Sequence, residues 1–285
     1  MDNVHKFTVE RMCKIFKVST SGYYKWRVKR PIKVQETSEV EAMIKYEYER
    51  SRGTYGSPRI AIELNRDSHN CSKSTVARHM NRMNIAARNK RKFKVTTNSN
   101  HDYHIFDNLL NRQFDVEIPG TVWVSDITYI RVANHWMYLT VVIDLADRMV
   151  IGWSLSNNMS AKDTVIKAFI NACHLRSPSI DFTFHSDRGV QYACNDFAQE
   201  VKSAKGIQSM SRKGNCWDNA VSESFFKTFK IECVYKRKIK SSNEAFSIIF
   251  DYIDGWYNTQ RQHSYLNGIA PIDAYILKTQ FSHAA

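Results

Sequence analysis

Residues 114–237 carry the pattern that most restricts the fold of this chain. A nearly uninterrupted apolar run at 138–144 (Y-L-T-V-V-I-D) is typical of a strand covered on both faces. Residues rich in β-branched and aromatic side chains predict further strands at 121–131, 150–154, 181–186 and 207–210. Helices are expected at 160–175, 195–205 and 218–235. The order β-β-β-α-β-α-β-α predicts an α/β domain with a mixed five-stranded sheet and helices on its faces.

Positive charge is concentrated in the first 100 residues. They contain 22 Lys and Arg against 9 Asp and Glu, whereas residues 101–285 contain 19 of each, so the front of the chain accounts for the whole net charge of +13. A generally basic protein would spread this excess evenly. The asymmetry predicts a nucleic-acid-binding module joined to a neutral second part.

Two helix-turn-helix segments are predicted in the basic part. The first spans residues 7–28, where Met12, Ile15 and Phe16 share a face, although a small structural hairpin fits this pattern equally well. Residues 31–36, which begin with a proline, are expected to form a hinge.

The second segment pairs a helix at 58–66 with one at 74–83. An apolar stripe on the later helix is formed by Val76, Met80 and Met83. The opposite side carries Lys73, Arg78 and Arg82, which we expect to contact DNA; the alternative is a solvated basic face. Ser72 or Ser74 can cap this helix. A linker follows whose cations, Arg88, Lys90, Arg91 and Lys92, suit a phosphate backbone.

Three acids could converge in the predicted α/β domain. Asp126 lies in the first strand, Asp187 ends the fourth, and Glu223 lies in the first turns of the last helix. Parallel pairing of those two strands would make the aspartates neighbours. Three carboxylates repel one another unless a cation lies between them, and their oxygens suit Mg²⁺ or Mn²⁺. Two such ions, about 3.5–4 Å apart, would hold a scissile phosphodiester.

Each acid by itself also fits an ordinary role. The aspartates could be strand-end or turn acids, and Glu223 could pair with Lys227 on its own helix. On that helix we expect Val221, Phe225 and Phe229 to pack on the sheet, and Lys227 and Lys230 to lie beside the phosphate. Asp144 and Asp218 are interpreted as structural acids.

Three sequence blocks surround these acids: W-V-S-D-I-T-Y at 123–129, H-S-D-R-G-V-Q-Y at 185–192 and S-R-K-G-N-C-W-D-N-A-V-S-E-S-F-F at 211–226. They resemble the signature blocks of bacterial insertion-sequence transposases of the DDE superfamily, and are most similar to the OrfB product of the family called number three. The Y-G-S-P-R-I run at 55–60 and a C-terminal block from Tyr257 to Pro271 resemble the same family, so the resemblance covers nearly the whole chain.

This resemblance implies an RNase-H-like (integrase) core in which Asp126, Asp187 and Glu223 bind two Mg²⁺ or Mn²⁺ ions. It implies cleavage of one DNA strand at an element end, followed by attack of the freed 3′-OH on another phosphodiester. The expected partners are terminal inverted repeats, target DNA, further copies of the chain, and an upstream helix-turn-helix product or fusion. The chain begins without that extension, so we also keep open an accessory DNA-binding role and a simple RNase-H-like nuclease. The residues expected to contact DNA or brace the acids are His185, Gln191, Arg212, Lys213, Asn215, Trp217, Asn219, Lys227 and Lys230.

The predicted organisation has five parts: residues 1–35 and 36–87 with one helix-turn-helix each, the linker at 88–113, the catalytic core at 114–237 and a helical tail at 238–285. The six cysteines are scattered without a C-x-x-C pair, which favours reduced thiols over disulfides or a zinc site. No apolar run approaches eighteen residues and no signal segment is found. We therefore expect no membrane partner and a bacterial cytoplasmic protein that joins the nucleoid when it is bound to DNA.

Overall fold

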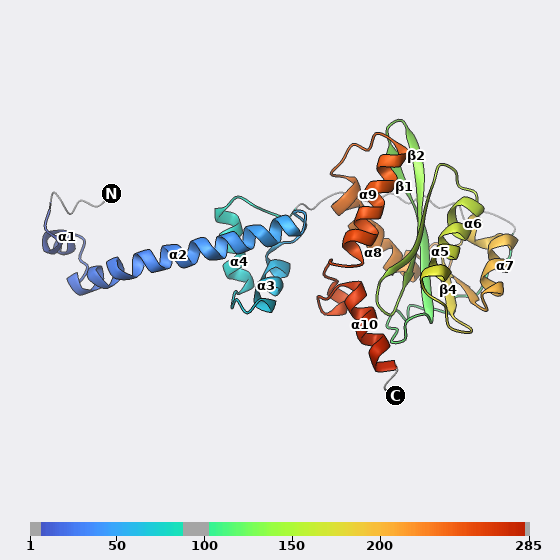
Figure 1. Ribbon diagram of the computed structural model, residues 1–285, viewed down its shortest axis with the longest axis horizontal. Helices are drawn as coiled ribbons and strands as arrows, with labels where there is room; N and C mark the ends of the chain where they lie inside the picture. The colour runs from blue at the N-terminus through green and yellow to red at the C-terminus, as the bar shows by residue number, and fades with distance from the viewer. Residues whose placement is uncertain (1–6, 88–102, 283–285) are drawn as a thin grey trace. The chain divides into compact units, whose positions relative to one another are not determined.

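The computed structural model describes residues 7–87 and 103–282. The chain divides into two compact units, residues 1–87 and residues 88–285, and each is described by itself (Figure 1). None of the helices in the described part of the chain combines the length and apolarity needed to cross a bilayer.

The described part of the first unit is helical. Its elements are α1 (Val9–Ile15), α2 (Thr20–Arg50), α3 (Ser57–Arg66) and α4 (Lys73–Arg82). Serines cap two of them: Ser19 accepts the backbone N–H of Gly22 at the start of α2, and Ser72 accepts that of Thr75 at the start of α4. Pro58 occupies the first turn of α3, where its missing N–H costs nothing.

The hinge expected at residues 31–36 is wrong, because α2 continues through these positions without interruption. Proline removes one backbone hydrogen bond and crowds the preceding turn, which can bend a helix without ending it. The boundary expected between residues 35 and 36 therefore lies inside a helix. The second helix of the 7–28 segment is accordingly 31 residues long and not short.

A small core joins α3 and α4 to the C-terminal half of α2. It contains Ile44, Ile60, Leu64, Val76 and Met80, all at most 4% exposed. The apolar stripe predicted on α4 is confirmed for Val76 and Met80, whereas Met83 lies one residue past the end of the helix and is partly buried. A guanidinium also links two of the helices. Arg50 of α2 lies 2.8 Å from the carboxylates of both Glu47 and Glu63.

The second unit is built on a five-stranded mixed sheet in the order β3-β2-β1-β4-β5, as predicted. Its strands are β1 (Val122–Val132), β2 (His135–Asp144), β3 (Val150–Ser156), β4 (Thr183–Ser186) and β5 (Ile207–Met210). The first three form an antiparallel meander, whereas β4 pairs in parallel with β1 and with β5. Strand β1 is therefore central.

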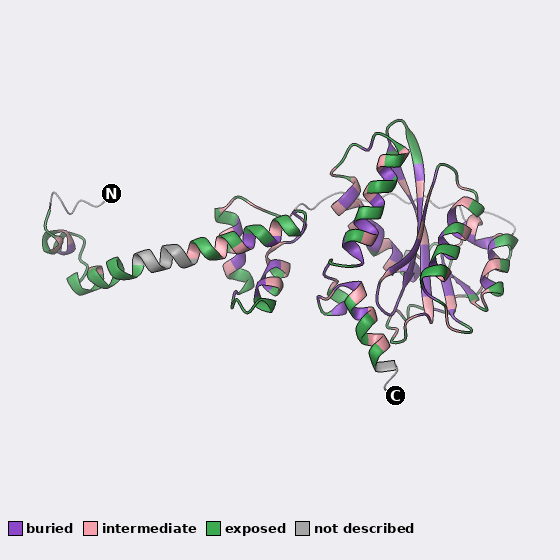
Figure 2. Ribbon diagram, viewed as in Figure 1, coloured by how far each residue is buried: buried purple, intermediate pink, exposed green. Residues whose placement is uncertain are grey.

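Helices cover both faces of this sheet (Figures 1 and 2). One face carries the π-helix η2 (Lys162–Ile166), α5 (Lys167–Leu175), α6 (Val190–Ala193) and α7 (Asn195–Ser203). Between this layer and the sheet lies an aromatic core that includes Trp123, Phe169, Phe182 and Phe184. The rings of Trp123 and Phe182 are 4.8 Å apart between centroids. Burial of these rings fixes α5 and α7 on the sheet.

The other face carries α8 (Ala220–Phe229) and the C-terminal tail. The 3₁₀-helix η3 (Cys216–Asn219) precedes α8 and the π-helix η4 (Lys230–Val234) follows it. The tail contains α9 (Ser242–Tyr252), the π-helix η5 (Ile253–Tyr257), the short η6 (Ser264–Leu266) and α10 (Pro271–Ser282), the last of which was not predicted. Phe225 of α8 meets the ring of Tyr257 at 4.9 Å, and Phe229 meets Tyr252 at 5.3 Å. The tail thus forms part of the packing that holds α8.

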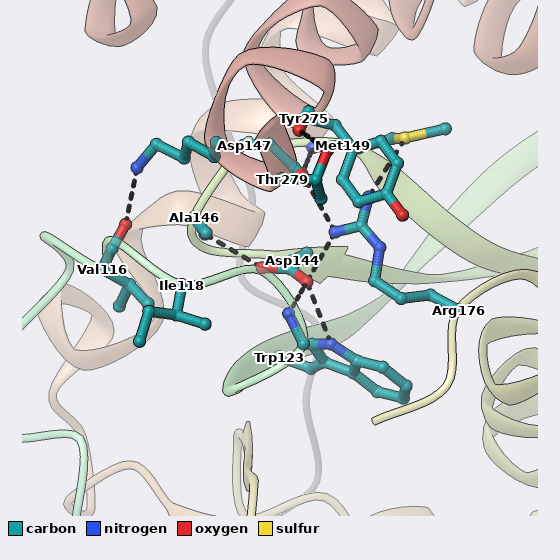
Figure 3. A network of polar contacts seen from close by, with 12 residues as sticks. Val116, Ile118, Trp123, Asp144, Ala146, Asp147, Met149, Arg176, Tyr275 and Thr279 are labelled. Atoms are coloured by element: carbon teal, nitrogen blue, oxygen red, sulfur yellow. Dashed lines mark hydrogen bonds and ion pairs between the residues drawn. The ribbon is translucent and has the colours of Figure 1, made fainter. Parts of the chain in front are cut away.

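A buried charge network connects the sheet to α5 and α10 (Figure 3). The Arg176 guanidinium at the end of α5 donates 2.6 Å hydrogen bonds to Asp144 and Asp147. Asp144 also accepts the backbone N–H of Gly120 and the indole N–H of Trp123. The ring of Tyr275 on α10 covers the guanidinium at 4.1 Å. Asp144 is therefore a structural acid, as predicted.

Removal of the Arg176 guanidinium should destabilise this network strongly. Asp144 and Asp147 are 0% exposed, so Arg176→Ala leaves two carboxylates in the interior without their cation. We expect a loss of about 3–5 kcal/mol in the free energy of unfolding at pH 8, measured with urea. Lys202→Ala, which removes an exposed cation on α7, serves as the control and should change this free energy by less than about 0.5 kcal/mol.

The loss of unfolding free energy in Arg176→Ala should depend on pH. Burial, and then the neighbouring Asp144, already raise the pKa of Asp147 to about 6. A carboxyl whose pKa is raised on folding favours the folded state increasingly as pH falls through that pKa. Arg176→Ala should therefore cost less at pH 5 than at pH 8, and an equal cost at both would contradict the assignment.

Gly152 of β3 lies where helix α5 comes closest to the sheet. A Cβ at this position would meet the carbonyl oxygen of Ala168 at 2.3 Å and the backbone nitrogen of Ala172 at 2.6 Å. Gly152→Ala should lower the free energy of unfolding by about 1–3 kcal/mol, because backbone atoms cannot move aside as a flexible side chain does. Gly255→Ala, whose Cβ meets nothing nearer than 3.4 Å, should have no such cost in the same urea titration.

Candidate active site

Two of the three predicted acids lie on neighbouring strands at the centre of the sheet. The parallel register pairs Val124 of β1 with His185 of β4. Asp126 and Asp187 each follow two residues later, so continuing the register brings them opposite one another. Asp187 comes directly after the last residue of β4, and its Oδ1 accepts the backbone N–H of Gly189 at 2.9 Å.

Glu223 reaches the same region from α8. It lies in the first turn of this helix and is partly buried. Asn219, at the helix start, donates from its side-chain amide to the backbone carbonyl of Ser125 at 3.2 Å. Because Ser125 precedes Asp126, this bond ties the beginning of α8 to the strand that carries the first acid.

The pKa of Asp126 reflects its burial and the charges of the other two acids. Removal from water raises its pKa well above the usual range, and the negative charges of Asp187 and Glu223 raise it further. Burial also raises the pKa of Glu223. Lys230 lies close enough for its charge to act on Asp126 in the opposite sense, while burial lowers the pKa of the lysine itself. Such carboxylates favour a proton or a cation between them.

The acids do not form a closed cage. Among residues 7–87 and 103–282, no group of three or more His, Cys, Asp and Glu side chains lies close enough together to hold a metal ion. The donors themselves are all carboxylate oxygens, which fit a hard divalent cation.

His185 braces strand β4 from inside the protein. It is 0% exposed, and its Nδ1 and Nε2 lie 2.9 Å and 3.1 Å from the hydroxyls of Ser209 and Ser211. The Ser211 hydroxyl donates to the carbonyl of Ser186, so it accepts from Nε2–H, and Nδ1 accepts from Ser209. Burial lowers the pKa of His185 to about 4, so the ring is neutral at pH 7. The prediction that His185 contacts DNA is therefore wrong, because its ring lies inside the protein; it braces β4 next to Asp187.

Asp218 organises the loop between β5 and α8. Its buried carboxylate accepts from Arg212, Arg112 and Asn108, each at 2.8–2.9 Å. These hydrogen bonds, those of Arg212 first, hold the pKa of Asp218 well below its usual range. Asp218 is structural, as predicted.

Tyr192 is a supporting residue to which the sequence analysis gave no role. Its hydroxyl lies 2.7 Å from that of Ser125, next to Asp126. The ring is 1% exposed, and burial together with the charges of Asp126 and Asp187 raises its pKa well above the usual range. Its place in the block at 185–192, five residues after Asp187, was the only signal in the sequence.

Comparison with known proteins identifies the family. Residues 116–216 and 206–271 each match a family model described as an integrase core domain, and residues 35–93 match an HTH-like domain. The chain is 37% identical over 262 residues to the insertion element IS600 uncharacterized 31 kDa protein of Shigella sonnei, covering 91% of this chain and 96% of that protein. It is 35% identical over 269 residues to the transposase InsF for insertion sequence IS3A of Escherichia coli (strain K12), covering 93% of each. The chain belongs to the IS3 transposase family.

A solved structure also aligns with this IS3-family chain, the HTLV-2 integrase catalytic core domain in complex with magnesium. The alignment covers 55% of this chain and 97% of that one, with 15% identity and a TM-score of 0.40. This likeness is too weak to add to the family assignment, which rests on the sequence relatives and on the sheet.

The DNA contacts predicted around the acids of this IS3-family core fall into two groups. Trp217, Lys213 and Lys227 are exposed, Trp217 at 69%, and Gln191 and Lys230 are partly exposed. Arg212 and Asn215 are engaged within the loop, since Arg212 binds Asp218 and Asn215 accepts from Arg112. Asn219 is 5% exposed and bonded to β1, so the prediction that it contacts DNA is wrong; it positions α8.

The cations predicted on the HTH-like domain are accessible where they are described. Lys73, Arg78 and Arg82 are exposed on α4, and helical geometry puts Arg78 and Arg82 opposite its buried stripe. Arg82 also lies 3.5 Å from Glu41 of α2, which takes up part of its charge. Arg88, Lys90, Arg91 and Lys92 lie outside the described residues.

Proposed function

We propose that this IS3-family chain is a DNA transposase that binds terminal inverted repeats, cleaves one strand to free a 3′-OH and joins it to another phosphodiester. The observation that carries this proposal is that the parallel register of β1 and β4, continued by two residues, sets Asp126 opposite Asp187, and that the charges of Asp187 and Glu223 both act on Asp126. The relatives support it, since one is named a transposase and the matched domain is an integrase core.

Asp126, Asp187 and Glu223 would hold Mg²⁺ or Mn²⁺, two ions per site. When bound, such ions activate the attacking oxygen and stabilise the leaving one. The protein groups around them have separate tasks. Lys230 and Lys227 would attract the phosphate, His185 and Tyr192 support the strands that carry the aspartates, and Asn219 holds α8 in register with β1.

The first unit would bind the inverted repeat. Three exposed cations on α4 face away from its core, and the start of the helix presents backbone N–H groups that suit a phosphate. A separate surface, which is a candidate for protein contact, lies nearer the N-terminus. Ile15, Phe16 and Trp26 are 67%, 73% and 49% exposed, which supports coverage by another copy of this chain or by an upstream-frame partner.

The assignment of Glu223 can be tested by Glu223→Gln, which keeps the shape of the side chain and removes its charge. We expect strand joining on inverted-repeat DNA with Mg²⁺ to fall by about 100-fold or more, because a neutral amide binds the divalent ion more weakly than a carboxylate does. Asp196→Asn is the matched control, since Asp196 is an exposed acid in the first turn of α7 and should leave joining unchanged.

Equal activity of Glu223→Gln and wild type would remove Glu223 from the active site. Two other results would point to the alternatives. Cleavage without joined products would indicate an RNase-H-like nuclease. Activity only after addition of an upstream partner would indicate an accessory product.

The α4 surface is tested by Arg78→Ala combined with Arg82→Ala. Loss of two phosphate contacts should weaken binding to inverted-repeat DNA and reduce the slope of log K against log salt by about 2. Lys29→Ala combined with Lys45→Ala removes two exposed cations from α2 and provides the control. Unchanged affinity and slope in fluorescence anisotropy would exclude α4 from the interface.

A further inference from the structure

The outer end of the β1–β2 hairpin carries aromatic side chains that none of the roles described above uses. Tyr129 and Arg131 lie two residues apart on β1 and share a face, and their partners across the hairpin are Tyr138 and Trp136. We call Tyr129, Arg131, Trp136 and Tyr138 the hairpin platform. The ring of Tyr129 lies 5.1 Å from that of Tyr138 and 6.3 Å from that of Trp136.

Trp136 is the exposed member of the platform. It is 49% exposed, although the other strand residues on β2 from Met137 to Asp144 are buried or partly buried. The Arg131 guanidinium lies 5.3 Å from the centre of its ring. A flat aromatic surface beside a fixed cation is the combination that binds a nucleobase together with its phosphate.

The platform is held rigidly. The Arg131 Nε–H donates to the carbonyl of Ala133 in the hairpin turn, at 3.1 Å. The backbone N–H of Ala133, whose φ is 43°, donates to the carbonyl of Ile239 at 2.8 Å. The turn is therefore fixed from outside by the segment that follows η4, so a ligand would meet side chains that are already ordered.

Charge at this end of the hairpin is complementary to DNA. The segment that fixes the turn carries Arg237, Lys238 and Lys240, all exposed. Lys238 and Lys240 flank Ile239, so together with Arg131 they place positive charge near the turn, whereas residues 101–285 as a whole carry no net charge. An apolar protein partner has no need of these cations, but a phosphate backbone does.

The platform is connected to the loop that follows Asp187. Side chains alternate along β1, so Tyr129 and Arg131 lie on the opposite face of the sheet from Asp126. Met159 forms this connection. The Tyr129 hydroxyl donates to its sulfur, and the side chain of Gln191, four residues after Asp187, donates to its carbonyl.

We propose that the hairpin platform stacks an unpaired nucleobase of the DNA strand that passes through the active site. The base lies on Trp136, and its flanking phosphates lie against Arg131 and the cations of residues 237–240. This inference rests on the proposed function, because it assumes that the strand held by the three acids is DNA. It adds a binding site for a single-stranded segment at the outer end of the β1–β2 hairpin.

The test uses the full chain with EDTA, so that no strand is cut, and a 20-nucleotide single-stranded DNA that carries one 2-aminopurine. Stacking on Trp136 quenches the fluorescence of this base. We expect the wild type to quench it on binding and Trp136→Ala to lose most of the quenching, with affinity weakened about 5- to 150-fold. Trp136→Phe, which keeps a ring, should retain part of both effects.

Two comparisons separate stacking from charge and from folding. Trp136→Ala should leave the salt slope of binding unchanged, whereas Arg131→Ala should reduce it by about 0.7, the value for one phosphate contact on a single strand. Phe250→Ala removes an aromatic ring that is 53% exposed on α9, on the opposite face of the sheet, and should behave as the wild type.

The proposal is overturned if Trp136→Ala quenches and binds like Phe250→Ala. It is also overturned if Trp136→Ala instead reduces self-association in sedimentation, because the platform would then be a contact between copies. Since the experiment requires no catalysis, quenching that is the same with and without Trp136 sinks the platform alone. Full joining activity in Glu223→Gln would sink the active-site assignment and leave the platform as a single-strand binding site.

Discussion

The parallel pairing of β1 with β4 is the contact on which the rest of the second unit depends. It makes β1 the central strand, and it brings Asp126 and Asp187 to adjacent positions although 60 residues separate them in the sequence. Parallel strands need a crossover connection, and here the crossover from β3 to β4 supplies α5. The close approach of α5 to Gly152 then fixes the layer whose aromatic core supports both strands.

Buried polar side chains position the strands and the helix that carry Asp126, Asp187 and Glu223. His185, Ser209 and Ser211 link β4 to β5, Tyr192 meets Ser125 beneath β1, and Asn219 joins α8 to β1. Each partner is neutral, so none competes for the charge of the carboxylates. Burial and the charges of the neighbouring acids raise the pKa of Asp126, and burial raises that of Glu223.

The C-terminal tail has a structural role that its polar sequence hides. The rings of Tyr252 and Tyr257 pack against Phe229 and Phe225 of α8. Arg261 of the tail pairs at 2.8 Å with Glu232, which lies in the π-helix η4 that follows α8. The helix that carries Glu223 is thus clamped between the sheet and the tail. At its far end, the chain after η4 turns toward the β1–β2 hairpin and fixes it through Ile239. The hairpin platform and the acid on α8 are in this way held by one continuous segment.

The sequence by itself predicted where the strands and most of the apolar stripes lie, and it singled out the three acids as candidates, because hydrophobic period and motif are local properties. It predicted the mixed five-stranded sheet, the buried face of α4 and the structural roles of Asp144 and Asp218. Tertiary structure alone decided which polar residues are accessible. His185 and Asn219 read as DNA contacts in the blocks around the acids, but both lie inside, since burial depends on which elements cover a residue and not on its neighbours in sequence. The docking of α10 through Tyr275 was equally hidden, because it depends on packing against Arg176, which is distant in the sequence. The continuity of α2 past Pro31 was missed because proline can bend a helix without ending it.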